Sequence, residues 1–176
     1  RDRVDDADAT GVLGNCRGTA QHFGLTDVDV QLGTLSKALG TVGGYVAGRK
    51  ELIEYLVNYS RSFIFSTALS PADIGAALEA LIIVKNEPLV EEQLNENTTY
   101  MANKLQSMGI ECDDETPIFP IIVGDNEMAL SLAYELELRG IIITAIRPPT
   151  VPVGASRLRL TVTAAHRQEQ LDHVAN

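Results

Sequence analysis

Short apolar runs with a period of two alternate along this chain with longer stretches in which apolar residues recur at helical spacing. The clearest strand pattern runs from Arg157 to Thr163, where leucine and valine alternate with arginine and threonine. The clearest short helical pattern runs from Lys50 to Tyr59. Strands that are separated by helices pack into layers, so this alternation predicts an α/β architecture.

Turn residues and the same periodicities place the other elements. Further strands are predicted at residues 1–6, 28–33, 45–47, 63–65, 118–123 and 141–146, with a glycine-rich loop between the first two. Further helices are predicted from Pro71 to the Asn86-Glu87-Pro88 break, from there to Gly109, at 127–139 and at 167–176. Pro88 lacks an amide donor and disfavours helix before it, so two domains are expected, residues 1–88 and 89–176.

The charge balance limits what the protein can bind. The formal net charge is −10, which argues against nucleic acid and anionic membranes as partners. No apolar run approaches the roughly 20 residues of a membrane span. Cys16 and Cys112 have neither the spacing of a metal site nor that of a disulfide framework. We therefore expect a soluble, cytoplasmic protein without a metal.

Because the chain begins at Arg1 and stops inside an amphipathic pattern, we also expect it to be part of a longer chain.

Lys37 is the first residue with possible chemistry. It follows a predicted strand and lies among small hydroxyl residues, in the run Thr34-Leu35-Ser36-Lys37-Ala38. A lysine amine in such a place can form an imine with a carbonyl cofactor. On this local pattern alone, an ordinary surface lysine of a loop fits better.

Two further patterns place charged groups at the ends or on the open faces of strands. Asp5 and Asp6 end the first predicted strand, where a carboxylate can fix a protonated ring nitrogen, or can simply cap a turn. Arg157 and Arg159 point away from the apolar face of their strand, where one could bind a substrate carboxylate or pair with a surface acid. His166 fits a capping role better than a catalytic one. Neither nucleotide-binding glycine motif is present.

Taken in order, four motifs resemble the α-oxoamine synthases, which are pyridoxal 5'-phosphate (PLP) enzymes of fold type I. The motifs are VDDADATGVLG from Val4, GTLSKALG from Gly33, STALSP from Ser66, and RPPTVP from Arg147 with RLRL and TAAH after it. The last is most similar to the branch that serves biotin biosynthesis. The resemblance covers essentially the whole chain but only the C-terminal half of the family's length. It implies the end of the PLP-binding large domain at residues 1–88 and the small C-terminal α/β domain at residues 89–176.

The resemblance also implies roles for individual residues. Lys37 would form the Schiff base with PLP and move protons, and Asp5 would pair with the pyridinium nitrogen. Thr34 would contact the cofactor phosphate, and Ser66 or Thr67 would reach the phosphate of the neighbouring subunit in a homodimer. Arg159 would bind the carboxylate of the amino acid.

The implied activity is that of an acyltransferase. It joins L-alanine to a pimeloyl group carried by coenzyme A or by a carrier protein, with loss of carbon dioxide. The alternatives are 2-amino-3-ketobutyrate coenzyme A ligase, against which the RPPTVP stretch argues, another α-oxoamine synthase, and a non-catalytic fragment or subunit.

Two departures from the family pattern bear on activity. The family has a histidine at the position of Asp8, in the implied cofactor site, where it donates a hydrogen bond to the phenolic oxygen of PLP. A carboxyl group can donate only when it is protonated, so we expect weaker activity or an altered imine pKa, which Asp8→His should restore. The family's N-terminal half, with the residue that stacks on the ring, is absent, so this chain alone is expected to bind PLP poorly and to be inactive.

Overall fold

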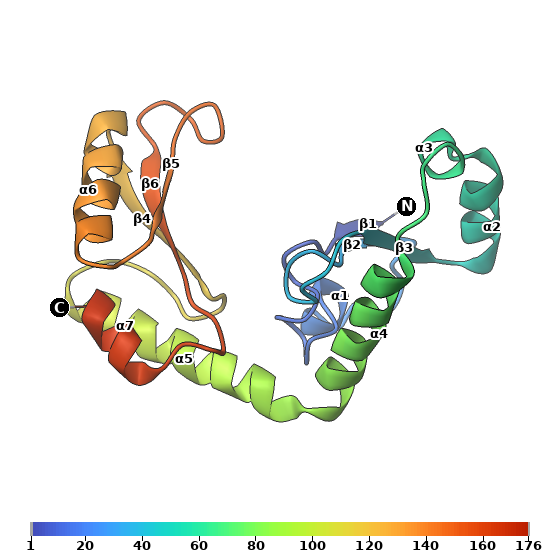
Figure 1. The fold of residues 1–176 in the computed structure, drawn as a ribbon, viewed down its shortest axis with the longest axis horizontal. Coiled ribbons are helices and arrows are strands. Elements are labelled where there is room, and N and C mark those ends of the chain that lie inside the picture. Colours follow the sequence, from blue (N-terminus) through green and yellow to red (C-terminus); the bar gives the residue numbers. More distant parts are fainter. Residues whose placement is uncertain (1, 176) are drawn as a thin grey trace. The chain divides into compact units, whose positions relative to one another are not determined.

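The computed structural model describes residues 2–175 and shows two compact units, Arg1–Glu91 and Glu92–Asn176 (Figure 1). Each unit contains one three-stranded sheet with helices, which confirms the predicted α/β class. Within residues 2–175, no helix combines the length and the apolar character that crossing a bilayer requires.

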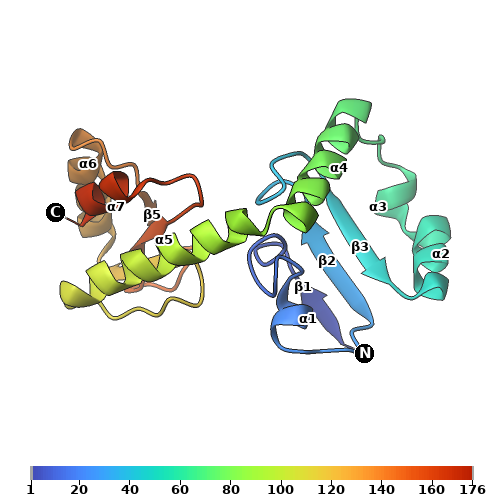
Figure 2. The same ribbon diagram turned by 90° about the horizontal axis from the view of Figure 1, so that it is seen from below.

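The sheet of the first unit has the order β1-β2-β3 (Figure 2). β1 (Arg3–Asp5) runs parallel to β2 (Val30–Thr34), which pairs in antiparallel fashion with β3 (Gly44–Gly48). The helices are α1 (Thr19–His22), α2 (Lys50–Tyr59), α3 (Arg61–Ile64) and α4 (Pro71–Asn86). The predicted bounds of α2 are confirmed, whereas α1 lies in a stretch that the sequence pattern assigned to a loop.

Local signals set both ends of α4. The Ser70 hydroxyl oxygen accepts a hydrogen bond from the Asp73 N–H at 3.2 Å, and Pro71 occupies the first turn, where its missing amide costs nothing. The helix stops at Asn86, two residues before Pro88, as predicted. The serine cap and the prolines are therefore local signals that mark both ends of this element.

The strand predicted at residues 63–65 is wrong, because Phe63 and Ile64 belong to helix α3 and Phe65 is its C-cap residue. The N–H of Ile64 donates to the carbonyl of Ser60 at 2.9 Å, and that of Phe65 donates to the carbonyl of Arg61 at 3.0 Å. The Arg61 guanidinium also lies 5.5 Å from the centre of the Phe65 ring, an i,i+4 contact typical of a helix. Three apolar residues in a row are too few to distinguish the two periods.

A strained turn lies between β1 and α1. Asn15 and Cys16 both have positive φ, at 55° and 62°, and the Arg17 N–H donates to the Gly14 carbonyl at 3.1 Å. Two central residues of this kind define a type I′ turn, which prefers Asn-Gly. Burial raises the pKa of the Cys16 thiol to about 11, with a further contribution from Glu91, so the thiol is a poor nucleophile at neutral pH.

Cys16→Gly is therefore expected to stabilise the protein. Glycine removes the left-handed strain of about 1–2 kcal/mol. It also makes the unfolded chain more flexible, which costs roughly 0.5–1 kcal/mol, so a net gain of about 1 kcal/mol in the free energy of unfolding is expected. Urea denaturation would measure it. Cys16→Val is the control and should destabilise, because a β-branched residue fits positive φ worst; equal stability of the two variants would contradict the prediction.

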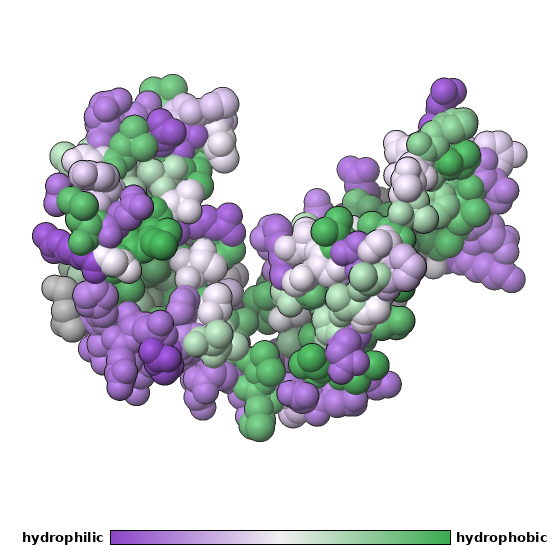
Figure 3. Space-filling model, in the orientation of Figure 1, coloured by the Kyte–Doolittle hydropathy of each residue, from purple (hydrophilic) through white to green (hydrophobic). Residues whose placement is uncertain are grey.

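The first unit leaves many large apolar side chains exposed. On α2 and α3 they include Tyr59 and Phe63, and Phe65 follows at 76% exposure. On α4 they are Ile74, Leu78, Leu81, Ile82 and Ile83. Figure 3 shows apolar surface over these helices. An apolar surface of this extent is typical of an interface.

The sheet of the second unit is antiparallel and has the order β4-β6-β5. Its strands are β4 (Ile118–Gly124), β5 (Thr144–Ile146) and β6 (Ser156–Thr161), and its helices are α6 (Asn126–Leu138) and α7 (Gln168–Val174). Helix α5 (Pro88–Ser107) begins before the boundary and continues into this unit. The strand predicted from residue 141 begins only at Thr144. The last predicted helix ends at Val174 within the described residues; Asn176 lies outside them.

The core of the second unit lies between α5, α7 and the sheet. Leu158, Leu160 and Val162 are buried while Arg159 and Thr161 are exposed, which confirms the predicted alternation. The buried cluster consists of Met101, Ala102, Leu105, Phe119, Leu160, Val162 and Leu171. This packing orients the polar face of β6 away from the core.

Hydrogen bonds and an ion pair among Tyr100, Lys104 and Asp172 link α5 to α7. The Tyr100 hydroxyl donates to Asp172 Oδ1 at 2.5 Å, and Lys104 Nζ lies 2.9 Å from the same oxygen. The hydrogen bond from Tyr100, with that from Lys104, lowers the pKa of Asp172 below its ordinary value of 3.8. The bond to Asp172 raises the pKa of Lys104 above its ordinary 10.5. The ionised Asp172 carboxylate therefore stabilises the fold above pH 3.8, and this stabilisation is lost as the pH falls through the lowered pKa of Asp172. The stabilisation that the charged Lys104 contributes is lost as the pH rises through the raised pKa of Lys104.

Asp172→Asn is expected to lower the melting temperature at pH 7, and this effect should shrink as the pH falls from 3.8 towards 2, because the wild-type carboxyl group becomes protonated as the pH passes its lowered pKa. Thermal melts across this pH range would measure the difference. Glu54→Gln is the matched control, because the exposed pair of Lys50 and Glu54, 3.7 Å apart, should contribute less. The same destabilisation at pH 2 and pH 7 would contradict the prediction.

Candidate active site

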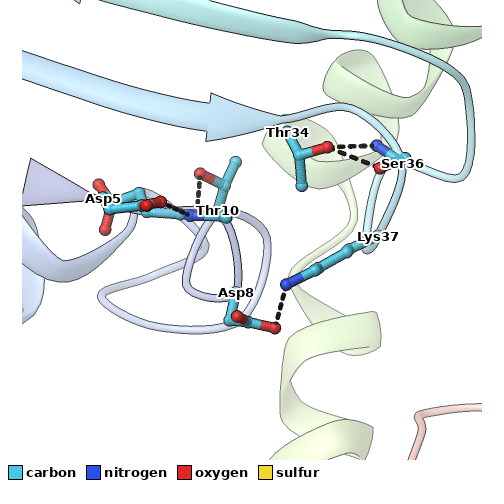
Figure 4. A network of polar contacts seen from close by, with 8 residues as sticks. Asp5, Asp8, Thr10, Thr34, Ser36 and Lys37 are labelled. Carbon is cyan, nitrogen blue, oxygen red and sulfur yellow. Dashed lines mark hydrogen bonds and ion pairs between the residues drawn. The ribbon is translucent and has the colours of Figure 1, made fainter. Parts of the chain in front are cut away.

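The parallel pairing of β1 and β2 brings two of the predicted site segments to one edge of the first sheet. Asp5, the last residue of β1, lies in register with Leu32 of β2. Thr34 ends β2, and Lys37 lies in the turn that follows. The carboxyl edge of parallel strands is where α/β sheets usually bind ligands. Figure 4 shows Asp5 and Thr34 at the ends of the two strands, and Asp8 and Lys37 on the loops that follow them.

Asp5 presents an exposed carboxylate. Its Oδ1 accepts a hydrogen bond from the Ala7 N–H at 3.0 Å. Its Oδ2 accepts none from the residues that the structure describes. The bond to Ala7 orients the carboxylate and leaves one oxygen available to a ligand.

Asp6, by contrast, is a structural residue, which the sequence pattern did not distinguish from Asp5. It is 1% exposed, and its carboxylate accepts hydrogen bonds from the Thr19 N–H at 2.8 Å and from Gln31 Nε2 at 3.2 Å. A Cβ at Gly18 would lie 2.6 Å from Asp6 Oδ2, so glycine is needed there. Asp6 thus ties the turn after β1 to α1 and β2. Its one signal in the sequence is that it follows Asp5 in the strand predicted at residues 1–6, where successive side chains point to opposite faces.

Lys37 meets Asp8 across the gap between the two loops. Lys37 Nζ lies 2.5 Å from Asp8 Oδ1, and the side chains are 47% and 61% exposed (Figure 4). The amine is therefore accessible, but a carboxylate holds it. The position of Asp8 beside the predicted Schiff-base lysine could not be deduced from sequence spacing.

Thr34 organises the loop that carries Lys37. Its hydroxyl donates to the Gly43 carbonyl at 3.1 Å and accepts a hydrogen bond from the Ser36 N–H at 3.1 Å. The hydroxyl groups of Thr34 and Ser36 are 2.6 Å apart. The Thr34 hydroxyl and the Ser36 N–H thus donate within the loop, and the Ser36 hydroxyl keeps a proton that it can donate to a phosphate group.

Tyr45 on β3 is a neighbour that the sequence analysis missed. It lies in register with Gly33, and a Cβ on Gly33 would clash with its ring. Its hydroxyl group is 2.7 Å from the Thr10 hydroxyl on the loop after β1. Tyr45 thus connects β2 and β3 to the loop that follows β1. Its only signal in the sequence is an aromatic residue opposite a glycine on a neighbouring strand.

The other predicted site residues lie elsewhere. Ser66 and Thr67 are exposed after α3, and no hydrogen bond or ion pair joins them to the Lys37 loop within residues 2–175. Arg159 belongs to the second unit, where it lies on β6 between Pro120 and Thr144. It lines a hollow of about 600 Å³ in that unit, together with Thr144 and Glu169.

The sequence pattern predicted a capping or packing role for His166 at the entry to the last helix, but the N-cap of α7 is Arg167. His166 Nδ1 accepts a hydrogen bond from the Thr163 N–H at 3.1 Å, which closes the turn after β6. Among the described residues, no group of three or more His, Cys, Asp or Glu side chains is placed to hold a metal ion.

Residues 4–176 match the family model described as Aminotransferase class I and II. The chain belongs to the aminotransferase class I and II family. The cofactor of this family is PLP, as the resemblance implied, and one solved structure of a relative is described as SPT with a PLP internal aldimine. The residues at the sheet edge fit this group, because they offer an amine for an aldehyde, a carboxylate for a ring nitrogen and hydroxyls for a phosphate.

Individual relatives in the aminotransferase class I and II family support the same assignment. The 8-amino-7-oxononanoate synthase of Lysinibacillus sphaericus is 51% identical over 175 residues, which cover 97% of this chain and 45% of the relative. The SPT structure with PLP has a TM-score of 0.93 at 29% identity, over 98% of this chain and 45% of its own. The crystal structure of 8-amino-7-oxononanoate synthase from Francisella tularensis has a TM-score of 0.85 at 27% identity, over 98% of this chain and 53% of the relative. The chain therefore spans about half the length of these relatives.

Proposed function

We propose that this chain provides part of the active site of a PLP-dependent acyltransferase. The proposed reaction condenses L-alanine with a pimeloyl thioester, with decarboxylation, to give 8-amino-7-oxononanoate in biotin biosynthesis. The observation that carries the proposal is the sheet edge that presents Lys37, Asp5 and Thr34 together. The relatives named 8-amino-7-oxononanoate synthase, at about half identity, support the choice of reaction.

Each residue at the sheet edge would have a different role, which follows from the chemistry of its side chain. The Lys37 amine would hold the cofactor aldehyde and later carry a proton to and from the substrate α-carbon. The free Asp5 oxygen would hold the ring nitrogen in its protonated form by a charge-assisted hydrogen bond. The Thr34 hydroxyl would contact the phosphate. PLP, once bound, supplies the electron sink for the charge that develops at the α-carbon.

Arg159 would bind the carboxylate of the amino acid. Its guanidinium is exposed on the polar face of β6 and can form two parallel hydrogen bonds with a carboxylate. In this proposal residues 1–88 would form the end of the PLP-binding large domain, and residues 89–176 would form the small domain that carries the substrate arginine.

A homodimer with a shared active site is part of the proposal. Ser66 and Thr67 would reach the cofactor phosphate of the partner subunit. Both are exposed, and they follow the exposed apolar residues Phe63, Ile64 and Phe65. Burial of such a surface between subunits would remove it from water. The free thiols of Cys16 and Cys112 support a reducing, cytoplasmic location.

Product analysis tests the proposal. The intact protein with PLP would be incubated with alanine and pimeloyl-coenzyme A, and separately with glycine and acetyl-coenzyme A, and the products identified by mass spectrometry. The proposal expects 8-amino-7-oxononanoate from the first mixture and negligible product from the second. Product only from glycine would indicate 2-amino-3-ketobutyrate coenzyme A ligase. No product from either mixture, or from a pimeloyl carrier protein, would indicate a non-catalytic subunit.

A further inference from the structure

The contact between Asp8 and Lys37 gives the site a feature that the proposed reaction does not require. The two residues come from different loops, 29 positions apart in the sequence, and meet as a carboxylate and an amine 2.5 Å apart. Arg49 and Lys50 make their ion pairs elsewhere in the unit, with Asp27, Asp29 and Glu54. Asp8 thus provides the carboxylate that faces the Lys37 amine.

An amine in this state is not ready to react with an aldehyde. Imine formation needs the nitrogen lone pair, so the ammonium must first pass a proton to a base such as the Asp8 carboxylate or water and leave the carboxylate. The nitrogen then bonds to the aldehyde carbon, the carbonyl oxygen leaves as water, and the proton returns to the new imine nitrogen. One ammonium and one aldehyde thus give one protonated imine and one water.

We propose that Asp8 is a positioning residue that acts as a latch on Lys37. It holds the amine at the sheet edge and slows its attack on electrophiles until the ion pair opens. This inference rests on the proposed role of Lys37 and concerns how the lysine is held before the cofactor is bound. Both side chains are about half exposed, so the effect is expected to be modest, about two- to fivefold, which is typical of exposed ion pairs.

Competitive labelling of lysines tests the latch without the cofactor. The intact, PLP-free protein would be treated briefly with acetic anhydride, and the acetylation rate of each lysine measured by peptide mass spectrometry. Asp8→Asn removes the charge and keeps the size, so Lys37 should be labelled about two- to fivefold faster at low salt. Salt at 1 M shortens the screening length to about 3 Å, so the difference from the wild type should largely disappear.

Two matched variants make the test specific. Asp8→Glu keeps the carboxylate, so labelling of Lys37 at a rate near that of the wild type is expected. Glu54→Gln opens the comparable pair on α2, so it should change the labelling of Lys50 and leave Lys37 unchanged. Equal labelling of Lys37 in the wild type and Asp8→Asn at low salt would overturn the latch. A faster rate in Asp8→Glu as well would also overturn it.

Loading with PLP separates this inference from the proposed function. Asp8→Asn should also speed the rise of imine absorbance when PLP is added to the cofactor-free protein, by a similar factor. If PLP never becomes attached to Lys37, the proposed function fails, while the acetylation rates still decide whether the latch exists. If PLP attaches at the same rate in both proteins, the latch fails and the proposed function stands.

Discussion

Replacing Lys37 with alanine should abolish the covalent attachment of PLP and lower kcat by about 10²–10⁴-fold, the factor that a positioned proton-transfer group typically contributes. The amine is the only group on the sheet-edge loops in Figure 4 that can form an imine. The PLP-loaded protein should show a visible absorbance band, and borohydride should fix the cofactor to the peptide that contains residue 37. Peptide mass spectrometry on the wild type and Lys37→Ala would measure both.

The control for this experiment is Lys50→Ala. Lys50 is highly exposed at the start of α2 and pairs with Glu54, so its loss should leave the absorbance band and the trapped peptide unchanged. Thermal melts of both variants would show whether either change acts through unfolding. Borohydride trapping of PLP in Lys37→Ala, at another lysine and with the wild-type yield, would remove Lys37 from its proposed role.

Most of the fold could be predicted because its signals are local. The Ser70 cap and Pro71 mark the start of α4, and alternation over six residues identifies β6. Short elements were not predictable. Helix α1 has four residues, and the Thr19 N–H at its start is bonded to Asp6, 13 positions away. Helix α3 is equally short, and its apolar residues show no period.

The site could be predicted only in part for the same reason. The motif around Lys37 is local, and so is the run of aspartates after β1. What places them together is the parallel pairing of β1 and β2, which joins Asp5 to Leu32 across 27 positions. The contacts of Tyr45 with Thr10 and of Lys37 with Asp8 depend on that pairing, so sequence spacing does not indicate them.

Asp5→Asn is expected to lower kcat about 10- to 100-fold with little change in stability. Asn keeps the shape and can still accept the hydrogen bond from Ala7, but it carries no charge. A charge-assisted hydrogen bond of the kind proposed for the ring nitrogen is worth about 1.5–3 kcal/mol, which corresponds to this range of rates. Steady-state kinetics with alanine and the absorbance spectrum of the bound cofactor would measure the effect.

The neighbouring Asp6 provides the matched comparison, because the two carboxylates have opposite surroundings. Asp6→Ala leaves the Thr19 N–H and the Gln31 amide without their buried partner, so it should lower the free energy of unfolding by about 3 kcal/mol. Asp5 is exposed, and within residues 2–175 its carboxylate bonds only to the turn beside it, so Asp5→Asn should leave the urea midpoint almost unchanged. Replacement of Asp5 should therefore change the absorbance spectrum and kcat, whereas replacement of Asp6 should change the free energy of unfolding. A spectrum and rate unaffected by Asp5→Asn would show that the cofactor ring is bound without this carboxylate.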